Sequence, residues 1–281
     1  MKNNFMPSID VKNLNLQFTI ESGQIFRWIY RDGWYYIGVG NRLLKIKQEG
    51  KKLIYSGKKI DKAFLSSFFR LDDNYDDILS EINKDIFINE AIKKYYGLRI
   101  LRQDPWECLV SFVCSSVSNI PKIKKNLFLI SAMSGQQVRV DDYTNYNFPS
   151  AESLGNLKKL KLTKIGFRAN YVHQLSKIIE KDYFQKLDRK SYGEAKSELV
   201  KLPGVGEKIA DCVLLFSMEH LEAFPVDVWI KRVMEDTYFN KRKSTNKKIM
   251  QFAQSYFGEY AGYAQQFLYH YKRTSSRYAI Q

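Results

Sequence analysis

The sequence is poor in cysteine and has no long hydrophobic run. Its 281 residues include three cysteines, which cannot all pair and whose spacing fits neither a disulfide framework nor a metal site. No stretch approaches the roughly 20 apolar residues of a membrane-spanning helix, and the start of the chain lacks the apolar segment of a secretion signal. We therefore expect a protein of the reducing cytoplasm, with no membrane partner and no metal held by side chains.

Acidic residues are scarce relative to basic ones. The chain has 45 Lys and Arg against 30 Asp and Glu, which gives a net charge of +15. This excess favours a polyanionic partner, most simply nucleic acid, with an anionic membrane surface as the alternative. Hydrophobic residues make up 44% of the chain, enough for a sizeable core in a protein of this length.

The first 60 or so residues predict an antiparallel sheet. Asp32-Gly33 separates two apolar and aromatic runs, residues 28–30 and 34–37, and this dipeptide suits the tight turn of a hairpin. Residues 44–47 alternate between apolar and basic side chains, as a half-buried strand does, and residues 51–55 suggest a further strand.

After Asp61 the pattern changes to that of helices. Apolar residues recur at helical spacing, and Pro105 directly follows Asp104, a combination typical of a helix start. Residues 105–117 are apolar on most faces and should be buried, whereas residues 134–147 are polar and predict an irregular segment. We therefore assign an α+β fold: residues 1–104 form an antiparallel sheet domain with helices, and residues 105–281 form a mainly helical body.

A short motif in the helical part, Leu202-Pro203-Gly204-Val205-Gly206, is typical of the turn in a helix–hairpin–helix. Its two glycines permit a tight turn with exposed backbone N–H groups. A helix that begins directly after the turn points its unpaired N–H groups and its positive dipole end the same way. Such a unit binds the phosphate backbone of a nucleic acid without reading its sequence.

Lys208 and Asp227 add a catalytic interpretation to this motif. The helix dipole disfavours an ammonium at Lys208, and a neutral amine is a nucleophile for a sugar C1′. Asp227 follows Pro225 and can begin a helix, where backbone N–H groups would keep it ionised. An amine with a carboxylate can cut an N-glycosidic bond. In a non-catalytic DNA-binding module, by contrast, Lys208 would contact phosphate and Asp227 would only cap a helix.

The stretch from Leu202 to Asp227 resembles the helix–hairpin–helix, Gly-Pro-Asp motif of DNA glycosylases, in which Lys208 takes the place of the Schiff-base lysine. Residues 22–28, residues 102–108 with 114–116, and residues 262–265 resemble further blocks of the 8-oxoguanine DNA glycosylase/AP lyase family, in the family's order. The resemblance implies excision of 8-oxoguanine from duplex DNA by base flipping, followed by β-elimination. A different damaged purine is the alternative substrate.

The same resemblance implies a monomer that requires no cofactor and whose hairpin backbone can hold a monovalent cation, as in related hairpins. It also assigns a pocket for the flipped base. The backbone carbonyl of Gly23 would accept the N7–H of 8-oxoguanine, and Gln265 would bond its Watson–Crick edge. Cys212 and Tyr269, the latter in place of the family's phenylalanine, would pack on the two faces of the base. Considered alone, Gly23 suits an ordinary turn, and Cys212 and Tyr269 suit a core.

The residues that face DNA by resemblance are Asn119, Lys122, Phe167, Arg168, Gly204, Val205, Gly206 and Trp229. Trp229 replaces a histidine that contacts phosphate, and Phe167 replaces a tyrosine wedge. Val117 and Lys122 replace an asparagine and an arginine that contact the cytosine opposite the lesion, whereas Arg168 keeps a second arginine. Because lysine donates from one point where arginine offers a planar fork, we expect the protein to tolerate other opposite bases better than stricter family members.

Overall fold

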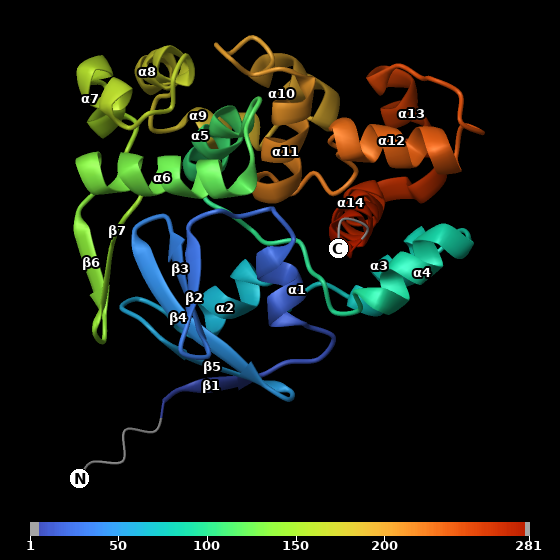
Figure 1. The fold of residues 1–281 in the computed structure, drawn as a ribbon, viewed down its shortest axis with the longest axis horizontal. Helices are drawn as coiled ribbons and strands as arrows, with labels where there is room; N and C mark the ends of the chain where they lie inside the picture. Colours follow the sequence, from blue (N-terminus) through green and yellow to red (C-terminus); the bar gives the residue numbers. More distant parts are fainter. Residues whose placement is uncertain (1–5, 279–281) are drawn as a thin grey trace.

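The computed structural model describes residues 6–278, which form a five-stranded sheet beside a larger body of helices (Figure 1). The strands run antiparallel in the order β1-β5-β4-β3-β2. The predicted hairpin is confirmed, because Arg31 pairs with Trp34 and the two residues between them, Asp32 and Gly33, have positive φ angles of 52° and 81°. The α+β fold predicted from the sequence is therefore confirmed.

The elements follow one another from a strand-rich to a helix-rich half of the chain. The strands are β1 (Ser8–Asp10), β2 (Trp28–Arg31), β3 (Trp34–Val39), β4 (Arg42–Glu49), β5 (Lys52–Ser56), β6 (Gln137–Val140) and β7 (Tyr143–Tyr146). The helices are α1 (Leu16–Glu21), α2 (Lys62–Phe68), α3 (Tyr75–Ile82), α4 (Ile86–Lys94), α5 (Pro105–Ser115), α6 (Ile120–Ser134), α7 (Leu157–Leu162), α8 (Arg168–Ile178), α9 (Tyr183–Leu187), α10 (Tyr192–Leu199), α11 (Glu207–Ser217), α12 (Val228–Thr237), α13 (Asn246–Phe257) and α14 (Ala261–Tyr278), with single 3₁₀ turns at Glu152–Leu154 and Gly258–Tyr260. Within the described residues, no helix has both the length and the apolar character needed to cross a bilayer.

The expectation of strands throughout the first 60 residues is wrong at one place. Helix α1 lies between β1 and β2, and it begins at Asn15, whose side chain accepts the Phe18 N–H at 2.9 Å. Leu16 and Ile20 on this helix join the core beneath the sheet. The turn after α1 carries Gly23, and Phe26 just beyond it packs in the separate core of the helical body. This segment therefore crosses from one part of the molecule to the other.

Helix α5 is confirmed as a buried element. Asp104 accepts the Glu107 N–H at 2.9 Å, and Pro105 occupies the first turn, where its missing N–H costs no hydrogen bond. Every residue from Cys108 to Cys114 is buried. The helix packs closely on α11, the second helix of the hairpin motif, and therefore supports that motif from the core.

Residues 134–147, predicted to be irregular, contain a second hairpin instead. Strands β6 and β7 pair antiparallel and extend alongside the five-stranded sheet (Figure 1). Val140 packs with Tyr36 of β3, and Lys45 contacts Asp141 at 2.6 Å. The apolar face of this hairpin comprises only a few residues, so its stability depends on the sheet it covers, which the local sequence does not show.

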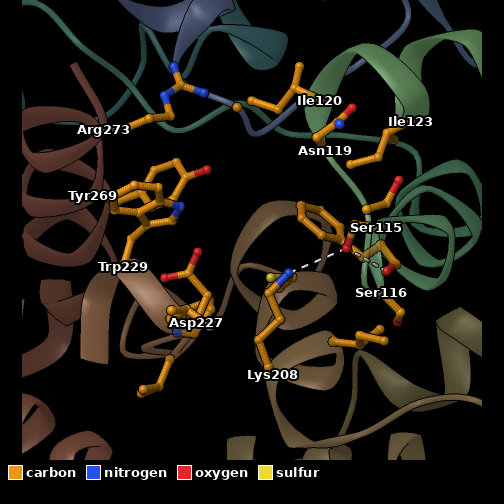
Figure 2. Close-up of a pocket in the computed structure, with 18 of the residues that line it drawn as sticks. Ser115, Ser116, Asn119, Ile120, Ile123, Lys208, Asp227, Trp229, Tyr269 and Arg273 are labelled. Atoms are coloured by element: carbon orange, nitrogen blue, oxygen red, sulfur yellow. Dashed lines mark hydrogen bonds between the residues drawn. The ribbon is translucent and has the colours of Figure 1, made fainter. Parts of the chain in front are cut away.

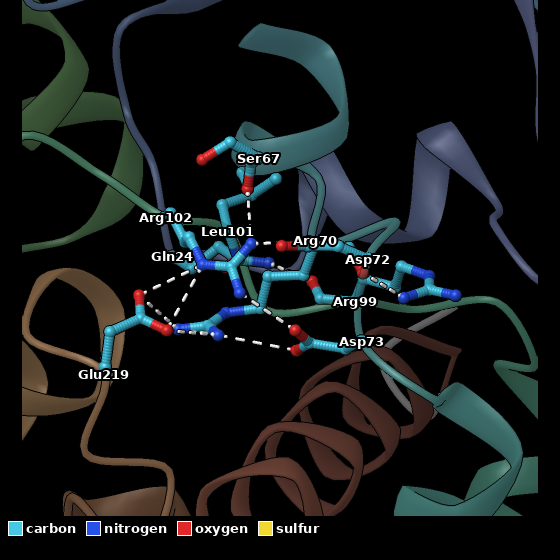
Figure 3. Close-up of polar contacts among 9 residues, drawn as sticks. All are labelled: Gln24, Ser67, Arg70, Asp72, Asp73, Arg99, Leu101, Arg102 and Glu219. Atoms are coloured by element: carbon cyan, nitrogen blue, oxygen red, sulfur yellow. Dashed lines mark hydrogen bonds and ion pairs between the residues drawn. The ribbon is translucent and has the colours of Figure 1, made fainter. Parts of the chain in front are cut away.

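An ionic network joins the segment after α2 to the loop after α11 (Figure 3). The Arg70 side chain is 1% exposed and donates to Glu219 at 2.8 and 3.0 Å. Arg102 donates to Asp72 at 2.6 Å, to Asp73 at 2.9 Å and to Glu219 at 3.1 Å. Loss of one partner would leave a buried charge uncompensated. The network therefore ties the helix that carries Lys208 to the N-terminal half of the chain.

Candidate active site

A cavity of about 870 Å³ lies where α5, α11, α12 and α14 meet the turn after α1 (Figure 2). Most residues predicted for the site line this cavity, namely Gly23, Asn119, Lys208, Cys212, Asp227, Trp229, Gln265 and Tyr269. They come from five separate segments of the chain. The fold therefore brings together residues that are as far apart in sequence as Gly23 and Tyr269.

Lys208 extends into the cavity from the first turn of α11, which begins after Gly206 as predicted. Its Nζ lies 3.4 Å from the Ser115 Oγ and 4.9 Å from the centroid of the Phe112 ring (Figure 2). The Ser115 hydroxyl donates its own proton to the Phe112 carbonyl at 2.7 Å. The Ser115 oxygen is therefore left to accept a hydrogen bond from the lysine.

Asp227 is the N-cap of α12, as its position after Pro225 predicted. Its carboxylate accepts the Ile230 N–H at 2.8 Å and lies across the same cavity from Lys208 (Figure 2). Burial raises the pKa of Asp227 above its ordinary value, even though the Ile230 N–H and the charge of Lys208 oppose the rise. The sequence predicts that Asp227 caps a helix, but it does not show the surrounding groups that bury the carboxylate.

Two residues contribute apolar walls to the cavity. Cys212 lies one turn beyond Lys208 on the same face of α11 and is 3% exposed. Burial raises the pKa of its thiol to about 12, so the group is neutral at physiological pH. Tyr269 faces the cavity from α14, and burial likewise raises the pKa of its hydroxyl. Neutral walls of this kind suit a flat, uncharged ligand better than an ion.

Gln265 and Gly23 supply polar groups between these walls. Gln265 is 5% exposed, and its Oε1 is buried with no hydrogen-bond partner among the described residues. A buried amide oxygen without a partner is costly, and its position in the cavity lining indicates that a ligand satisfies it. Gly23 has a φ of 91°, in a region that other residues avoid, and this conformation brings the turn into the cavity wall.

Arg168, predicted to face DNA, is turned inward. It is 3% exposed, and its guanidinium donates to the carbonyls of Ser116, Val117 and Ile165, at 3.0 Å for each of the last two. A direct contact with DNA would require these bonds to break. The sequence could not show this because two of the three acceptors, Ser116 and Val117, belong to a loop 52 and 51 residues earlier in the chain.

Val117 stands out on the loop that Arg168 holds. It is 90% exposed and has a φ of 48°, a left-handed conformation that is strained for a β-branched residue. Such strain costs about 1–3 kcal/mol and persists only where neighbours over-determine the conformation. The bonds from Arg168 to the Ser116 and Val117 carbonyls provide that constraint.

The remaining predicted DNA contacts lie outside the cavity lining. Lys122 is exposed on the first turn of α6, where Asn119 caps the helix by accepting the Lys122 N–H at 3.0 Å. Phe167 is 55% exposed at the start of α8. The hairpin turn has a φ of 75° at Gly204, and a Cβ there would lie 2.5 Å from the Tyr171 ring. These groups therefore do not belong to the base-binding cavity itself.

Several cavity residues were not predicted from the sequence, and among them Ser115 and Arg273 carry polar groups. Ser115 belongs to the Cys-Ser-Ser block, but nothing in its spacing relates it to Lys208, 93 residues away. Arg273 lines the cavity from α14, four residues after Tyr269 and eight after Gln265. That interval repeats along one face of a helix, so helical spacing was a signal that could have found Arg273.

The fold and the site together define a class of protein. A hairpin that presents backbone N–H groups leads into the helix that carries an amine, and a buried carboxylate faces that amine across a cavity large enough for a nucleobase. This combination defines a DNA glycosylase of the helix–hairpin–helix type.

Comparison with known proteins gives the family. Residues 8–109 match the family described as 8-oxoguanine DNA glycosylase, N-terminal domain, and residues 116–259 match the HhH-GPD superfamily base excision DNA repair protein family. The chain is 30% identical over 280 residues to the N-glycosylase/DNA lyase OGG1 of Arabidopsis thaliana, which covers 91% of this chain and 76% of that protein. The chain therefore belongs to the 8-oxoguanine DNA glycosylase family, as its motifs predicted.

Solved structures agree over nearly the full length. A structure described as MBOgg1 in complex with a low affinity DNA ligand superposes with a TM-score of 0.91 at 35% identity, over 98% of both chains. The 8-oxoguanine glycosylase/lyase of Clostridium acetobutylicum, in complex with double-stranded DNA that has cytosine opposite 8-oxoG, gives a TM-score of 0.88 at 29% identity. That match covers 97% of this chain and 99% of the clostridial one.

Proposed function

We propose that this protein excises 8-oxoguanine from duplex DNA and then cleaves the abasic strand by β-elimination. The observation that carries the proposal is the amine of Lys208 facing the carboxylate of Asp227 inside a base-sized cavity. The family membership supports it, as does the similar clostridial glycosylase/lyase, which is bound to duplex DNA containing 8-oxoG.

The chemistry needs one nucleophile and one anion. Lys208 attacks C1′ of the flipped nucleotide, and the electron pair of the glycosidic bond leaves with the base, which takes up a proton. The Asp227 carboxylate stabilises the positive charge that develops on the sugar. The nitrogen then loses a proton and forms a protonated Schiff base with C1′ as the C1′–O4′ bond breaks and O4′ takes up a proton. The Schiff base acidifies the C2′–H, so the C3′–O bond breaks by β-elimination.

Selection of the lesion rests on one backbone acceptor. 8-Oxoguanine carries an N7–H, whereas guanine presents a lone pair at N7. The Gly23 carbonyl accepts a hydrogen bond from the lesion and repels guanine. Cys212 and Tyr269 pack on the two faces of the base, and the amide of Gln265 bonds its Watson–Crick edge.

Selection of the opposite base is weak in this proposal. The guanidinium of Arg168 is committed to loop carbonyls, and Lys122 donates from a single point. Val117 fills the gap left by the flipped base through apolar contact and cannot hydrogen-bond the orphaned partner. No planar fork remains to recognise cytosine, so adenine, guanine or thymine opposite the lesion is tolerated.

The protein acts as a monomer on double-stranded DNA and requires no cofactor in this proposal. Its net charge of +15 and the hairpin turn, in which Gly206 is exposed and Val205 is buried, supply the contacts to phosphate. A monovalent cation bound by the hairpin carbonyls would strengthen the phosphate contact without taking part in the chemistry.

Borohydride trapping on a duplex with 8-oxoguanine opposite cytosine tests the proposal. The wild-type protein should be fixed covalently to the DNA, because reduction converts the Schiff base into a stable amine. Lys208→Gln should abolish both trapping and excision while it retains duplex binding. Lys231→Gln is the matched control, since Lys231 also lines the cavity, and this variant should still be trapped.

Three outcomes would contradict the proposal. Normal trapping of Lys208→Gln would remove Lys208 as the nucleophile. Trapping on a different damaged purine but not on 8-oxoguanine would favour the alternative substrate. Failure of the wild-type protein to be trapped on any lesion or abasic duplex would favour a non-catalytic DNA-binding module.

A further inference from the structure

The turn that carries Gly23 is held by side chains from the far end of the chain. The Arg273 Nη2 donates to the Glu21 carbonyl, and the Gln266 Nε2 donates to the Ser22 carbonyl at 3.3 Å. Both donors belong to α14. The two carbonyls before Gly23 are therefore already engaged, and α14 fixes the approach to this residue.

The far side of the turn is held in the same way. The Gln103 Nε2 donates to the Gln24 carbonyl at 2.8 Å, and the Gln103 N–H donates to the Phe216 carbonyl at 2.9 Å. Phe216 lies near the end of α11, the helix that carries Lys208. The carbonyls on both sides of Gly23 are thus bonded, and the turn is coupled to the catalytic helix as well as to α14.

Arg273 also contacts the stacking wall of the cavity. Its Nη1 lies 2.9 Å from the position that a Cβ on Gly23 would take, and the Tyr269 Cε1 lies 3.4 Å from the same point. The guanidinium carbon is 5.4 Å from the centroid of the Tyr269 ring. One side chain therefore lies against both the lesion-reading turn and the aromatic wall.

We propose that Arg273 is a positioning residue that sets the selectivity of this enzyme for 8-oxoguanine over guanine. The inference rests on the proposed function, in which the Gly23 carbonyl reads N7–H. A single acceptor discriminates only if it cannot move, because a shift of the turn would relieve its repulsion with the N7 lone pair of guanine. Arg273 prevents that shift by fixing the turn relative to Tyr269, so the acceptor is preorganised.

The chemistry of the guanidinium suits this task. Its planar fork can donate to a carbonyl through one nitrogen and lie against the Tyr269 ring at the same time, whereas a lysine offers one compact donor. Arg273→Lys keeps the charge and loses the fork, and Arg273→Met keeps the bulk and loses both. Lys272→Gln is the matched control because it removes one positive charge from the next residue of α14, which contacts Asp236 at 3.9 Å.

The test compares two reactions of the same protein. Single-turnover excision from a duplex with 8-oxoguanine opposite cytosine requires the base to be recognised, whereas β-elimination at a preformed abasic site does not. Arg273→Met should lower the excision rate about tenfold or more, equivalent to about 1.4 kcal/mol, and should leave β-elimination within about threefold of wild type. The excision rate of Arg273→Lys should lie between those of Arg273→Met and the wild type. Lys272→Gln should match the wild type in both reactions.

Binding gives a second measurement of selectivity. In the Lys208→Gln background, which performs no chemistry, Arg273→Met should narrow the ratio of affinities for 8-oxoguanine and guanine duplexes. Wild-type excision by Arg273→Met would overturn the inference while the proposed function stood. An equal fall in excision and β-elimination would also overturn it, because that result indicates general structural support.

Two further results are decisive. If Arg273→Met does not fold, the ratio of excision to β-elimination in Arg273→Lys decides, and an unchanged ratio refutes the inference. If the wild-type protein cleaves the abasic site but excises no 8-oxoguanine, the proposed function fails and this inference fails with it.

Discussion

The two sides of the cavity are constructed in opposite ways. On the side assigned to the lesion, Gln265 is 5% exposed and the carbonyls flanking Gly23 are bonded by side chains from α14 and from the segment before α5. On the side assigned to the orphaned base, Val117 is 90% exposed, and Phe167, which lies outside the cavity lining, is 55% exposed. The first side therefore presents polar groups that are buried and fixed, whereas the second presents apolar side chains that are exposed.

This difference indicates which of the two bases, the lesion or its partner, the protein distinguishes more strictly. A fixed acceptor or donor in a water-excluded site penalises the wrong ligand by leaving a polar group unsatisfied, which costs about 1–3 kcal/mol. An exposed apolar side chain makes similar contact with any base and therefore distinguishes little between them. The structure thus predicts an enzyme that is strict about the lesion and tolerant of the base opposite.

Replacement of Asp227 should lower the excision rate whatever base lies opposite the lesion, because both sides of the cavity serve the same reaction. Asp227→Asn should lower single-turnover excision by about 10²–10³-fold, since a neutral amide stabilises developing positive charge poorly. The factor should be the same for duplexes with cytosine or adenine opposite the lesion. Asp236→Asn, on the exposed face of α12, should leave the rate unchanged, and a near-normal rate for Asp227→Asn would exclude a catalytic role.

Substitution of Gly23 should impair recognition of the lesion without impairing binding to the rest of the duplex. An alanine there must hold a φ of 91° and would lie 2.9 Å from the Arg273 Nη1, so either the turn or the Arg273 guanidinium must shift. We expect Gly23→Ala to lower excision about 10- to 100-fold and to affect binding of an abasic duplex much less. Both would be measured in parallel.

The control for Gly23→Ala separates backbone strain from the loss of the reading group. Gly33→Ala meets the same strain, since Gly33 has a φ of 81°, but among the described residues no atom beyond its chain neighbours lies within 4 Å of its Cβ position. The control should show normal excision. Equal losses of excision and abasic binding in Gly23→Ala would instead indicate that the turn misfolds.

Restoring polar contacts at the side assigned to the orphaned base should increase the preference for cytosine opposite the lesion. Val117→Asn combined with Lys122→Arg adds a hydrogen-bonding gap filler and a planar fork, and one bidentate contact contributes about 1–3 kcal/mol of discrimination. The preference for cytosine over adenine should rise about tenfold in single-turnover excision. Lys125→Arg, at an exposed position on the same helix, should change nothing. An unchanged preference in the double variant would mean that Lys122 faces only solvent.

Local chemistry predicted much of the fold from the sequence. Asp32-Gly33 marks a turn because its backbone needs positive φ angles, and Asp104-Pro105 marks a helix start because of capping, so both features could be located from a few residues. Helix α1 and the β6–β7 hairpin escaped prediction because their short apolar faces are meaningful only against a partner surface.

The site could be predicted where spacing or motif carries the information. Lys208 and Asp227 are fixed by the hairpin motif and the helix cap, and the cavity brings both together with the predicted base-binding residues. The inward orientation of Arg168 and the raised pKa of Asp227 could not be predicted. Both depend on which groups from distant segments surround the side chain, and that information exists only after folding.

Single-turnover excision of 8-oxoguanine from four duplexes that differ only in the opposite base tests the central claim most directly. We predict that the four rates lie within about tenfold of one another, while guanine at the lesion position is not excised from any duplex. A preference for cytosine of about a hundredfold or more would contradict this account, because it would show that Arg168 leaves its loop carbonyls to recognise the orphaned base.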